Sequence, residues 1–215
     1  MNRNGIERNL KSCDELLAQM RQGSVGALSR LISFVENREP GWIDVMKAVY
    51  PDSQQAHFIG ITGPAGSGKS TLADRLAHLF LRRGSTVGII AIDPSSPRSG
   101  GAFLGDRIRM ATIAGAKGVF LRSMSSRGAL GGLSSAAVDA ARLMAAFGKD
   151  IILIETLGVG QAEVDVVGFA DVVIVVCTPN TGDSIQTLKA GIMEIGDLFV
   201  VNKSDLQGAN QTVAS

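Results

Sequence analysis

The sequence has few residues of the kinds that mark disulfide-rich or metal-binding proteins. Its 215 residues include only two cysteines, Cys13 and Cys177, and two histidines, His57 and His78. The cysteines lie far apart and Cys177 ends an apolar run, so we expect a buried thiol, no disulfide and a reducing, cytoplasmic setting. The histidines lack metal-ligand spacing to acids or cysteines, so we interpret both as structural.

An excess of charge of one sign is also missing. The 21 basic and 20 acidic residues leave a formal net charge of +1. No sustained basic stripe is visible, so we do not expect nucleic acid as a partner. No apolar run approaches the roughly 18 residues that a membrane span needs. The first residues also lack the apolar core of a signal peptide, so we expect no membrane partner.

The first fifty residues have helical patterns. Ser12 and Glu15 have capping-box spacing, a second helix is predicted to begin near Ser24, and a third carries Trp42 on its apolar face. We therefore expect a small helical appendage over residues 1–55, with its apolar faces packed on the rest of the chain.

From residue 58 onward, short apolar segments alternate with helical patterns. The segments are β-branched and almost continuously apolar, which is typical of parallel strands buried on both faces. This predicts an α/β fold of the P-loop NTPase type, a three-layer sandwich with a mostly parallel sheet, over residues 56–215. The predicted strands are 58–62, 86–92, 119–122, 151–155, 172–177 and 198–201, and the predicted helices are 69–83, 105–114, 134–147 and 184–195.

A glycine-rich segment between the first strand and the first helix of this region has the spacing G-x-x-x-x-G-K-S. This is the pattern of a phosphate-binding P-loop, in which backbone N–H groups and a helix N-terminus surround an anion. We expect Lys69 to contact the β- and γ-phosphates and Ser70 to ligate Mg²⁺. The expected nucleotide-binding residues here are Gly63, Pro64, Ala65, Gly66, Ser67, Gly68, Lys69, Ser70 and Thr71.

Three acidic residues follow the strands next in order. Asp93 ends the strand at 86–92, Asp106 comes after a polar loop, and Glu155 ends the strand at 151–155 in a Walker B pattern. Ligands of open α/β sheets bind at the carboxyl ends of the strands, so all three are candidate Mg²⁺ ligands with Ser70. Asp93 and Glu155, with Lys69, are the candidate catalytic residues. Asp106 has a second interpretation as an acid that stabilises a helix N-terminus.

The last predicted strand is followed by an N-K-x-D pattern, Asn202-Lys203-Ser204-Asp205. The Asp205 carboxylate only accepts hydrogen bonds, so it matches guanine N1–H and the exocyclic amine, whereas adenine would leave it unpaired. We expect Asn202 to bond the purine and the P-loop region, and Lys203 to cover the base. At the end of this strand, the pattern indicates GTP and GDP as the bound nucleotides.

Other candidates have weaker support. Gln161 has two interpretations, as a residue that orients the attacking water or as a solvated loop residue. Five arginines are possible transition-state cations without a diagnostic setting, and we interpret each as a surface or helix-capping residue: Arg98, Arg107, Arg109, Arg122 and Arg127.

Taken in order, these motifs resemble those of the MeaB/ArgK-type GTPases, the methylmalonyl-CoA mutase-associated G proteins related to the human methylmalonic aciduria type A protein. The resemblance covers nearly the whole chain. Its most specific parts are Asp93-Pro94-Ser95-Ser96-Pro97 and Glu155-Thr156-Leu157-Gly158-Val159-Gly160-Gln161.

The resemblance implies a G-protein chaperone that binds an adenosylcobalamin-dependent acyl-CoA mutase, gates its cofactor loading by GTP hydrolysis and protects it. It also implies three switch loops, over 93–106, after Glu155 and over 178–189. In the third loop, Lys189 matches a basic residue of the family. The resemblance further implies a homodimer. Ser184 stands where the family often has an acid, and the sequence stops ten residues after Asp205. We therefore expect a truncated G domain with weakened nucleotide binding and impaired dimerisation.

Three other functions remain as alternatives. A nickel-insertion GTPase of the same class would require clustered histidines or cysteines, and a kinase or ATPase linked to amino-acid transport would require ATP. A nucleotide-sensing adaptor would hydrolyse GTP negligibly. The sequence does not name the client mutase.

Overall fold

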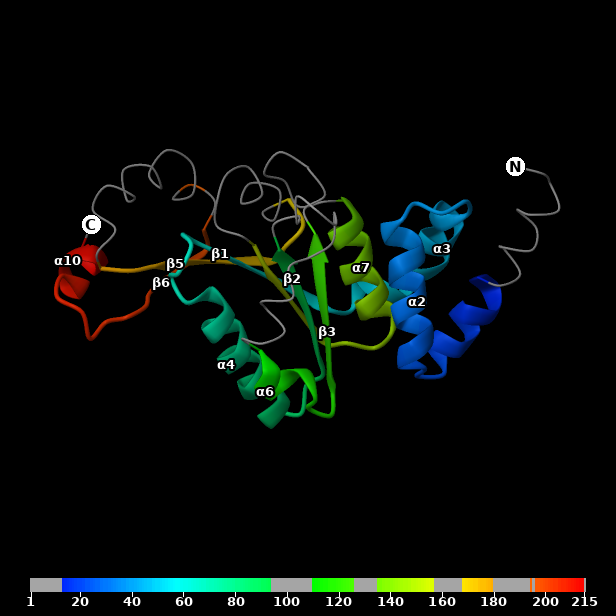
Figure 1. Ribbon diagram of the computed structural model, residues 1–215, viewed down its shortest axis with the longest axis horizontal. Helices are drawn as coiled ribbons and strands as arrows, with labels where there is room; N and C mark the ends of the chain where they lie inside the picture. The colour runs from blue at the N-terminus through cyan, green and yellow to red at the C-terminus, as the bar shows by residue number, and fades with distance from the viewer. Residues whose placement is uncertain are drawn as a thin grey trace.

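The computed structural model describes residues 13–93, 110–125, 135–156, 168–179, 194 and 196–214. Six parallel strands form one sheet in the order β3-β2-β4-β1-β5-β6. Helices cover both of its faces, with α4 and α6 on one side and α7, α2 and α3 on the other (Figure 1). The predicted α/β sandwich of the P-loop NTPase type is confirmed.

All six predicted strands are present. The largest difference is at β3, which continues three residues beyond the predicted end at residue 122 and pairs with β2 as far as Ser125. The strands are β1 (His57–Thr62), β2 (Val87–Asp93), β3 (Val119–Ser125), β4 (Ile151–Glu155), β5 (Val172–Cys177) and β6 (Leu198–Val201).

The described helices follow the predicted pattern, except for two short ones at 51–54 and 209–214 that were not predicted. The helix predicted over 105–114 is seen as α6 (Ala111–Ala114), and the first residues of that prediction lie outside the described ranges. Nearly all of the helix predicted over 184–195 also lies outside them. Residues 13–21 are helical. The other helices are α2 (Val25–Glu36), α3 (Trp42–Val49), the 3₁₀ helix η1 (Pro51–Gln54), α4 (Lys69–Arg82), α7 (Ser135–Ala146) and α10 (Ala209–Ala214).

Alternate residues of the central strands enter two separate hydrophobic clusters. In β4, Ile152 and Ile154 belong to the cluster that includes α2 and α7, whereas Ile151 and Leu153 belong to the cluster that includes α4. Successive side chains of a strand point to opposite faces, so a strand covered on both sides must be apolar at every position. This places Glu155, the next residue on the α4 face, at the carboxyl edge of the sheet.

The N-terminal helices share the first of these clusters. Leu28, Leu31 and Ile32 of α2 are fully buried, together with residues of α7. The Ser24 side chain caps α2 by accepting a hydrogen bond from the amide of Ala27. The predicted packing of these helices on the rest of the chain is therefore present, and the domain division near residue 55 stays a prediction.

Arg122 has a different role from the expected surface or helix-capping one. Its guanidinium forms an ion pair of 2.8 Å with Glu36 and donates a hydrogen bond of 3.1 Å to Ser33. Both partners belong to α2, and the arginine lies on β3. The ion pair thus joins the edge of the sheet to the N-terminal helices.

Three aspartates cap the amino edge of the sheet, opposite the P-loop. Each carboxylate accepts a hydrogen bond from a backbone amide on or next to a strand, which satisfies a donor that the ladder leaves open. The pairs are Asp150 with Thr86 at 2.6 Å, Asp171 with Phe58 at 2.8 Å and Asp197 with Val173 at 2.8 Å.

Both cysteines are free thiols. Cys13 is buried as part of the helical core, but Cys177, predicted to be buried, is only half-buried because it ends β5 at the carboxyl edge. Burial raises the pKa of both thiols. Across the ranges described above, the helices are too short or too polar to cross a membrane.

Candidate nucleotide-binding site

The P-loop connects β1 to α4 at the carboxyl edge of the sheet. The Lys69 side chain is buried and donates hydrogen bonds to the carbonyl oxygens of Gly63, at 2.8 Å, and Pro64, at 3.0 Å. Its ammonium group therefore lies inside the loop. The hydroxyl of Ser67 is also buried, and it has no hydrogen-bond partner in the described part of the chain. A loop with a buried cation and an unsatisfied hydroxyl suits an anionic ligand.

Two glycines of the loop allow contacts that a side chain would block. Gly63 has φ +136°, and a Cβ there would overlap the carbonyl oxygen of Val176 in β5. Gly68 has φ +96°, and a Cβ there would overlap Nδ2 of Asn202. Left-handed backbone is strained for other residues, so both positions require glycine for conformation and for space.

Ser70 and Glu155 meet at the first turn of α4. The Ser70 hydroxyl donates a hydrogen bond of 2.6 Å to Oε1 of Glu155, and both side chains are buried. A hydroxyl and a carboxylate are the hard oxygen ligands that Mg²⁺ prefers. The two residues fit the predicted metal site, and their roles as metal ligands stay a prediction.

The backbone of Asp93 lies near this pair. Ala91 pairs with Glu155 between β2 and β4, and Asp93 comes two residues later at the end of β2. Asp106, Gln161 and Lys189 lie outside the described residues. Within the described residues, no three histidine, cysteine or acidic side chains gather as a metal site, so the fit to Mg²⁺ depends on Ser70 and Glu155.

A second contact at this edge was not predicted. The hydroxyls of Thr62 and Thr156 are 3.0 Å apart in a buried hydrogen bond, and the Thr156 amide donates to the carbonyl oxygen of Ile61. Thr62 immediately precedes the P-loop and Thr156 immediately follows Glu155. The signal in the sequence is a threonine at the end of each of two neighbouring strands.

The N-K-x-D segment lies against the P-loop. Asn202 Nδ2 donates a hydrogen bond of 2.8 Å to the carbonyl oxygen of Ser67, so the predicted contact with the P-loop is present. The backbone N–H of Asn202 also donates a hydrogen bond of 2.9 Å to the carbonyl oxygen of Cys177. Lys203 has φ +56°, and both Lys203 and Asp205 are exposed. Their side chains are thus accessible to a ligand beside the loop.

Comparisons with known proteins find relatives over most of the chain. The family model of the methylmalonyl-CoA mutase-associated GTPase MeaB matches residues 28–215. A Pyrococcus horikoshii relative is 51% identical over 203 residues, which are 94% of this chain and 64% of the relative. The mouse methylmalonic aciduria type A homolog, mitochondrial, is 40% identical over 147 residues, which are 68% of this chain and 35% of the homolog.

A solved structure shares the fold. The crystal structure of a LAO/AO transport system kinase superposes with a TM-score of 0.74 at 29% identity, covering 95% of this chain and 60% of that one. The chain therefore spans less than two thirds of the length of these relatives. The family match extends over most of the chain and includes the P-loop, Glu155 and the N-K-x-D segment. The chain belongs to the family of methylmalonyl-CoA mutase-associated GTPases, MeaB.

Proposed function

We propose that this chain binds GTP and GDP with Mg²⁺ and hydrolyses GTP. The observation that carries the proposal is the convergence of two segments on the P-loop: Glu155 bonds Ser70, and Asn202 bonds Ser67. These contacts bring the phosphate loop, an acid at the end of β4 and a guanine-recognition pattern to one edge of the sheet. Such an edge is where ligands of open α/β sheets bind.

Each residue has a defined task in this proposal. Lys69 and the loop amides stabilise negative charge on the phosphates while water attacks the γ-phosphate. Ser70, Glu155, Asp93 and Asp106 hold Mg²⁺, which when bound neutralises charge on the β- and γ-phosphates. The sequence gives none of the candidate arginines a diagnostic setting as a transition-state cation. We therefore expect slow intrinsic hydrolysis, on the order of the unassisted Ras rate, that a partner stimulates.

The choice of base gives the sharpest test. Xanthine has a carbonyl where guanine has its exocyclic amine, so an Asp205→Asn variant exchanges an acceptor for a donor that xanthine can use. We expect the variant to lose affinity for GDP about tenfold or more and to gain affinity for xanthosine diphosphate. The matched control is Asp14→Asn, at an exposed position near the N-terminus and distant in sequence from Asp205. Equal affinity of the unaltered chain for ADP and GDP would contradict guanine recognition.

The client of this activity is the second part of the proposal. The family is named for its association with methylmalonyl-CoA mutase. We propose that the chain serves as a chaperone that gates adenosylcobalamin loading of such an acyl-CoA mutase, in the cytoplasm and within a homodimer. Co-purification with candidate acyl-CoA mutases, in GDP and in a non-hydrolysable GTP analogue, tests this. We expect a client mutase to bind the chain in a nucleotide-dependent way and to accelerate its GTP hydrolysis. The absence of both effects for every such mutase would contradict the chaperone role.

The solved structure described as a transport system kinase suggests one competing function. An ATP-dependent kinase acting on a basic amino acid would hydrolyse ATP, and arginine would stimulate it. Our proposal predicts hydrolysis of GTP in preference to ATP and no effect of arginine. Measuring phosphate release with each nucleotide, with and without arginine, distinguishes the two.

A further inference from the structure

A pocket lies on the face of the molecule that carries the N-terminal helices, across the sheet from α4. It has a volume of about 380 Å³ and lies between α3, η1 and α7. This is within the range of small-molecule pockets in proteins, roughly 300–1,000 Å³. Nothing in the proposed GTPase function uses this pocket.

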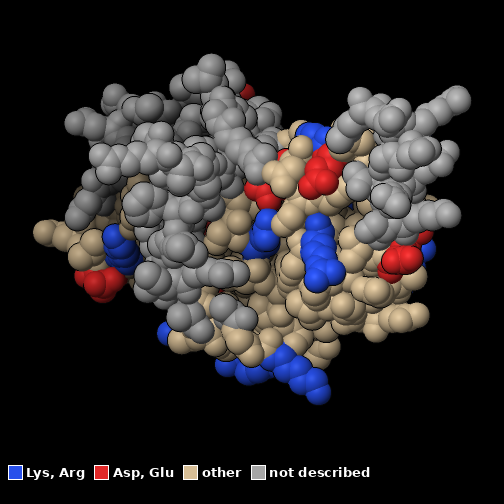
Figure 2. Space-filling view, turned by 45° about the vertical axis from the view of Figure 1, so that its right-hand side comes forward, with Lys and Arg blue, Asp and Glu red and all other residues tan. Residues whose placement is uncertain are grey.

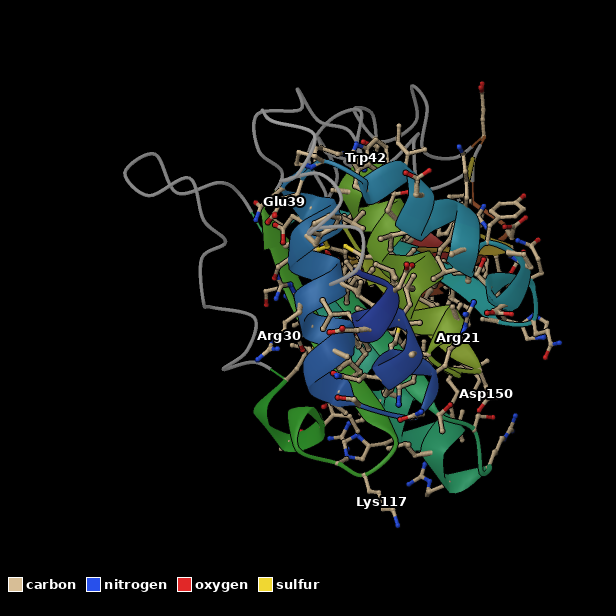
Figure 3. The ribbon with its side chains drawn as sticks, turned by 90° about the vertical axis from the view of Figure 1, so that its right-hand side faces the viewer. Arg21, Arg30, Glu39, Trp42, Lys117 and Asp150 are labelled. Carbon is tan, nitrogen blue, oxygen red and sulfur yellow. The ribbon has the colours of Figure 1, made fainter. Side chains whose placement is uncertain are left out.

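The wall of the pocket is mainly apolar and aromatic. Trp42 begins α3 beside α2 and α7 (Figure 3), and Ile43 and Tyr50 are 51% and 52% exposed. Water in contact with such a surface is released when an apolar body covers it, which favours binding. The apolar and aromatic residues of the lining are Trp42, Ile43, Met46, Tyr50 and Pro51.

Arg142 of α7 is the polar group that this wall leaves incompletely satisfied. Its guanidinium lies 4.8 Å from the ring centroid of Tyr50 and 5.2 Å from that of Phe169. Its hydrogen bond to the Ser53 hydroxyl is long, at 3.5 Å. Within the described residues Arg142 has no carboxylate partner. A guanidinium has five N–H donors, so most of them remain available to a ligand.

The charges around the pocket leave an excess of one cation. Asp139 is paired with Arg38, whose guanidinium lies 3.9 Å from the Trp42 ring centroid, and Asp44 is paired with Lys47 at 3.7 Å. Among the residues that the structure describes, Arg142 therefore remains as the cation of the lining without a carboxylate partner. On the face shown in Figure 2, basic side chains lie beside acidic ones near the middle of the view, and a separate group of basic side chains lies along its lower edge.

We propose that this pocket binds a small organic carboxylate with an apolar or aromatic body, whose carboxylate pairs with Arg142. The planar fork of a guanidinium matches a carboxylate with two parallel hydrogen bonds. A single available cation with two acidic side chains nearby suits a monoanion better than a phosphate dianion. The body of the ligand would cover Trp42, Ile43 and Tyr50.

The chain carries its own reporter for this site, because Trp42 is the single tryptophan of the sequence. The probes are 4-phenylbutanoate and its neutral counterpart 4-phenylbutanamide, titrated into the full chain while the tryptophan fluorescence is recorded. We expect a saturable change with the carboxylate and binding about tenfold weaker with the amide, because a charged hydrogen-bond pair is lost.

The same titration on variants tests the role of Arg142. Arg142→Gln should bind the carboxylate about tenfold more weakly, and Arg142→Lys should retain part of the affinity. Arg82→Gln, at an exposed position in the last turn of α4, is the matched control and should bind like the unaltered chain.

Three results would overturn the proposal: no saturable change, equal binding of acid and amide, or equal binding by Arg142→Gln. If Arg142→Gln does not fold by circular dichroism, the comparison of acid with amide on the unaltered chain decides alone. The titration needs no nucleotide, so its outcome is independent of the proposed GTPase activity.

Discussion

The side-chain amide of Asn202 donates a hydrogen bond of 2.8 Å to the carbonyl oxygen of Ser67 and occupies the space that a Cβ at Gly68 would need. One side chain thereby links the N-K-x-D segment after β6 to the P-loop after β1. The phosphate-binding and base-binding parts of the candidate site are therefore mechanically connected even without a ligand.

Replacing Gly68 by alanine should break this connection. The added methyl overlaps Asn202 Nδ2, and φ at this position is +96°, so the variant must shift the asparagine and bear backbone strain. We expect GDP affinity to fall about tenfold or more, with about 1–3 kcal/mol of stability lost to strain. Gly66→Ala is the matched control, because Gly66 has φ +74° but a Cβ there meets no atom within 4 Å. Equal loss of GDP affinity in the two variants would contradict a specific role for the Asn202 contact.

Replacing Glu155 by glutamine should separate metal binding from nucleotide binding. The amide oxygen of glutamine can still accept the hydrogen bond from Ser70, but the negative charge is lost. We expect the Mg²⁺ concentration for half-maximal GTP hydrolysis to rise about tenfold, while GDP binding without Mg²⁺ changes little. The measurement is phosphate release over a Mg²⁺ titration, with Glu15→Gln at an exposed site as control. An unchanged Mg²⁺ requirement would exclude Glu155 from the metal site.

The ion pair between Arg122 and Glu36 should contribute to stability through the N-terminal helices. The two side chains are 27% and 12% exposed, so removing one partner leaves a poorly hydrated charge. We expect Arg122→Leu and Glu36→Leu each to lower the free energy of unfolding by about 2 kcal/mol. The double variant should lose about 1 kcal/mol less than the sum of the two. Urea unfolding of all four proteins gives this coupling, and additive losses would show that the pair is not coupled.

Asp150 should make stability depend on pH in the acid range. Hydrogen bonds from the backbone and side chain of Thr86 lower the pKa of this carboxyl below its usual value of 3.8. A carboxyl whose pKa is depressed by folding stabilises the protein above the unfolded pKa, and this contribution is lost as the pH falls through the folded pKa. Asp150→Asn should therefore flatten the fall in stability below about pH 4.

The comparison for this prediction is Asp14→Asn, an exposed change outside the amino edge of the sheet. Thermal unfolding of the three proteins over the acid range measures the slopes. A slope for Asp150→Asn as steep as that of the unaltered chain would show that the Thr86 contacts do not stabilise the carboxylate.

Much of the fold could be predicted from the sequence because parallel strands buried on both faces need uninterrupted apolar runs. Ile151 to Ile154 and Val172 to Val176 are such runs, and both were placed correctly as β4 and β5. The P-loop was predicted from its spacing and its position between a strand and a helix, since glycines with positive φ are required where the chain turns toward a phosphate.

Features that depend on pairs distant in the sequence were missed. The partner of Arg122 lies 86 residues away on another element, and nothing in its neighbourhood identifies it. Cys177 was expected to be buried because its run is apolar, but its exposure depends on where β5 ends relative to the sheet edge. The pocket at Trp42 depends on three elements meeting, so periodicity within one helix could not predict it.

In the structure described above, Lys69 already satisfies two carbonyl oxygens of its own loop. An ammonium group has three N–H donors, so an incoming phosphate shares this cation with the carbonyl oxygens that it already contacts. The free energy gained at this residue on phosphate binding is therefore smaller than it would be for a lysine without internal acceptors. The internal acceptors also hold the Lys69 ammonium group inside the loop, so the lysine is already positioned before a ligand binds.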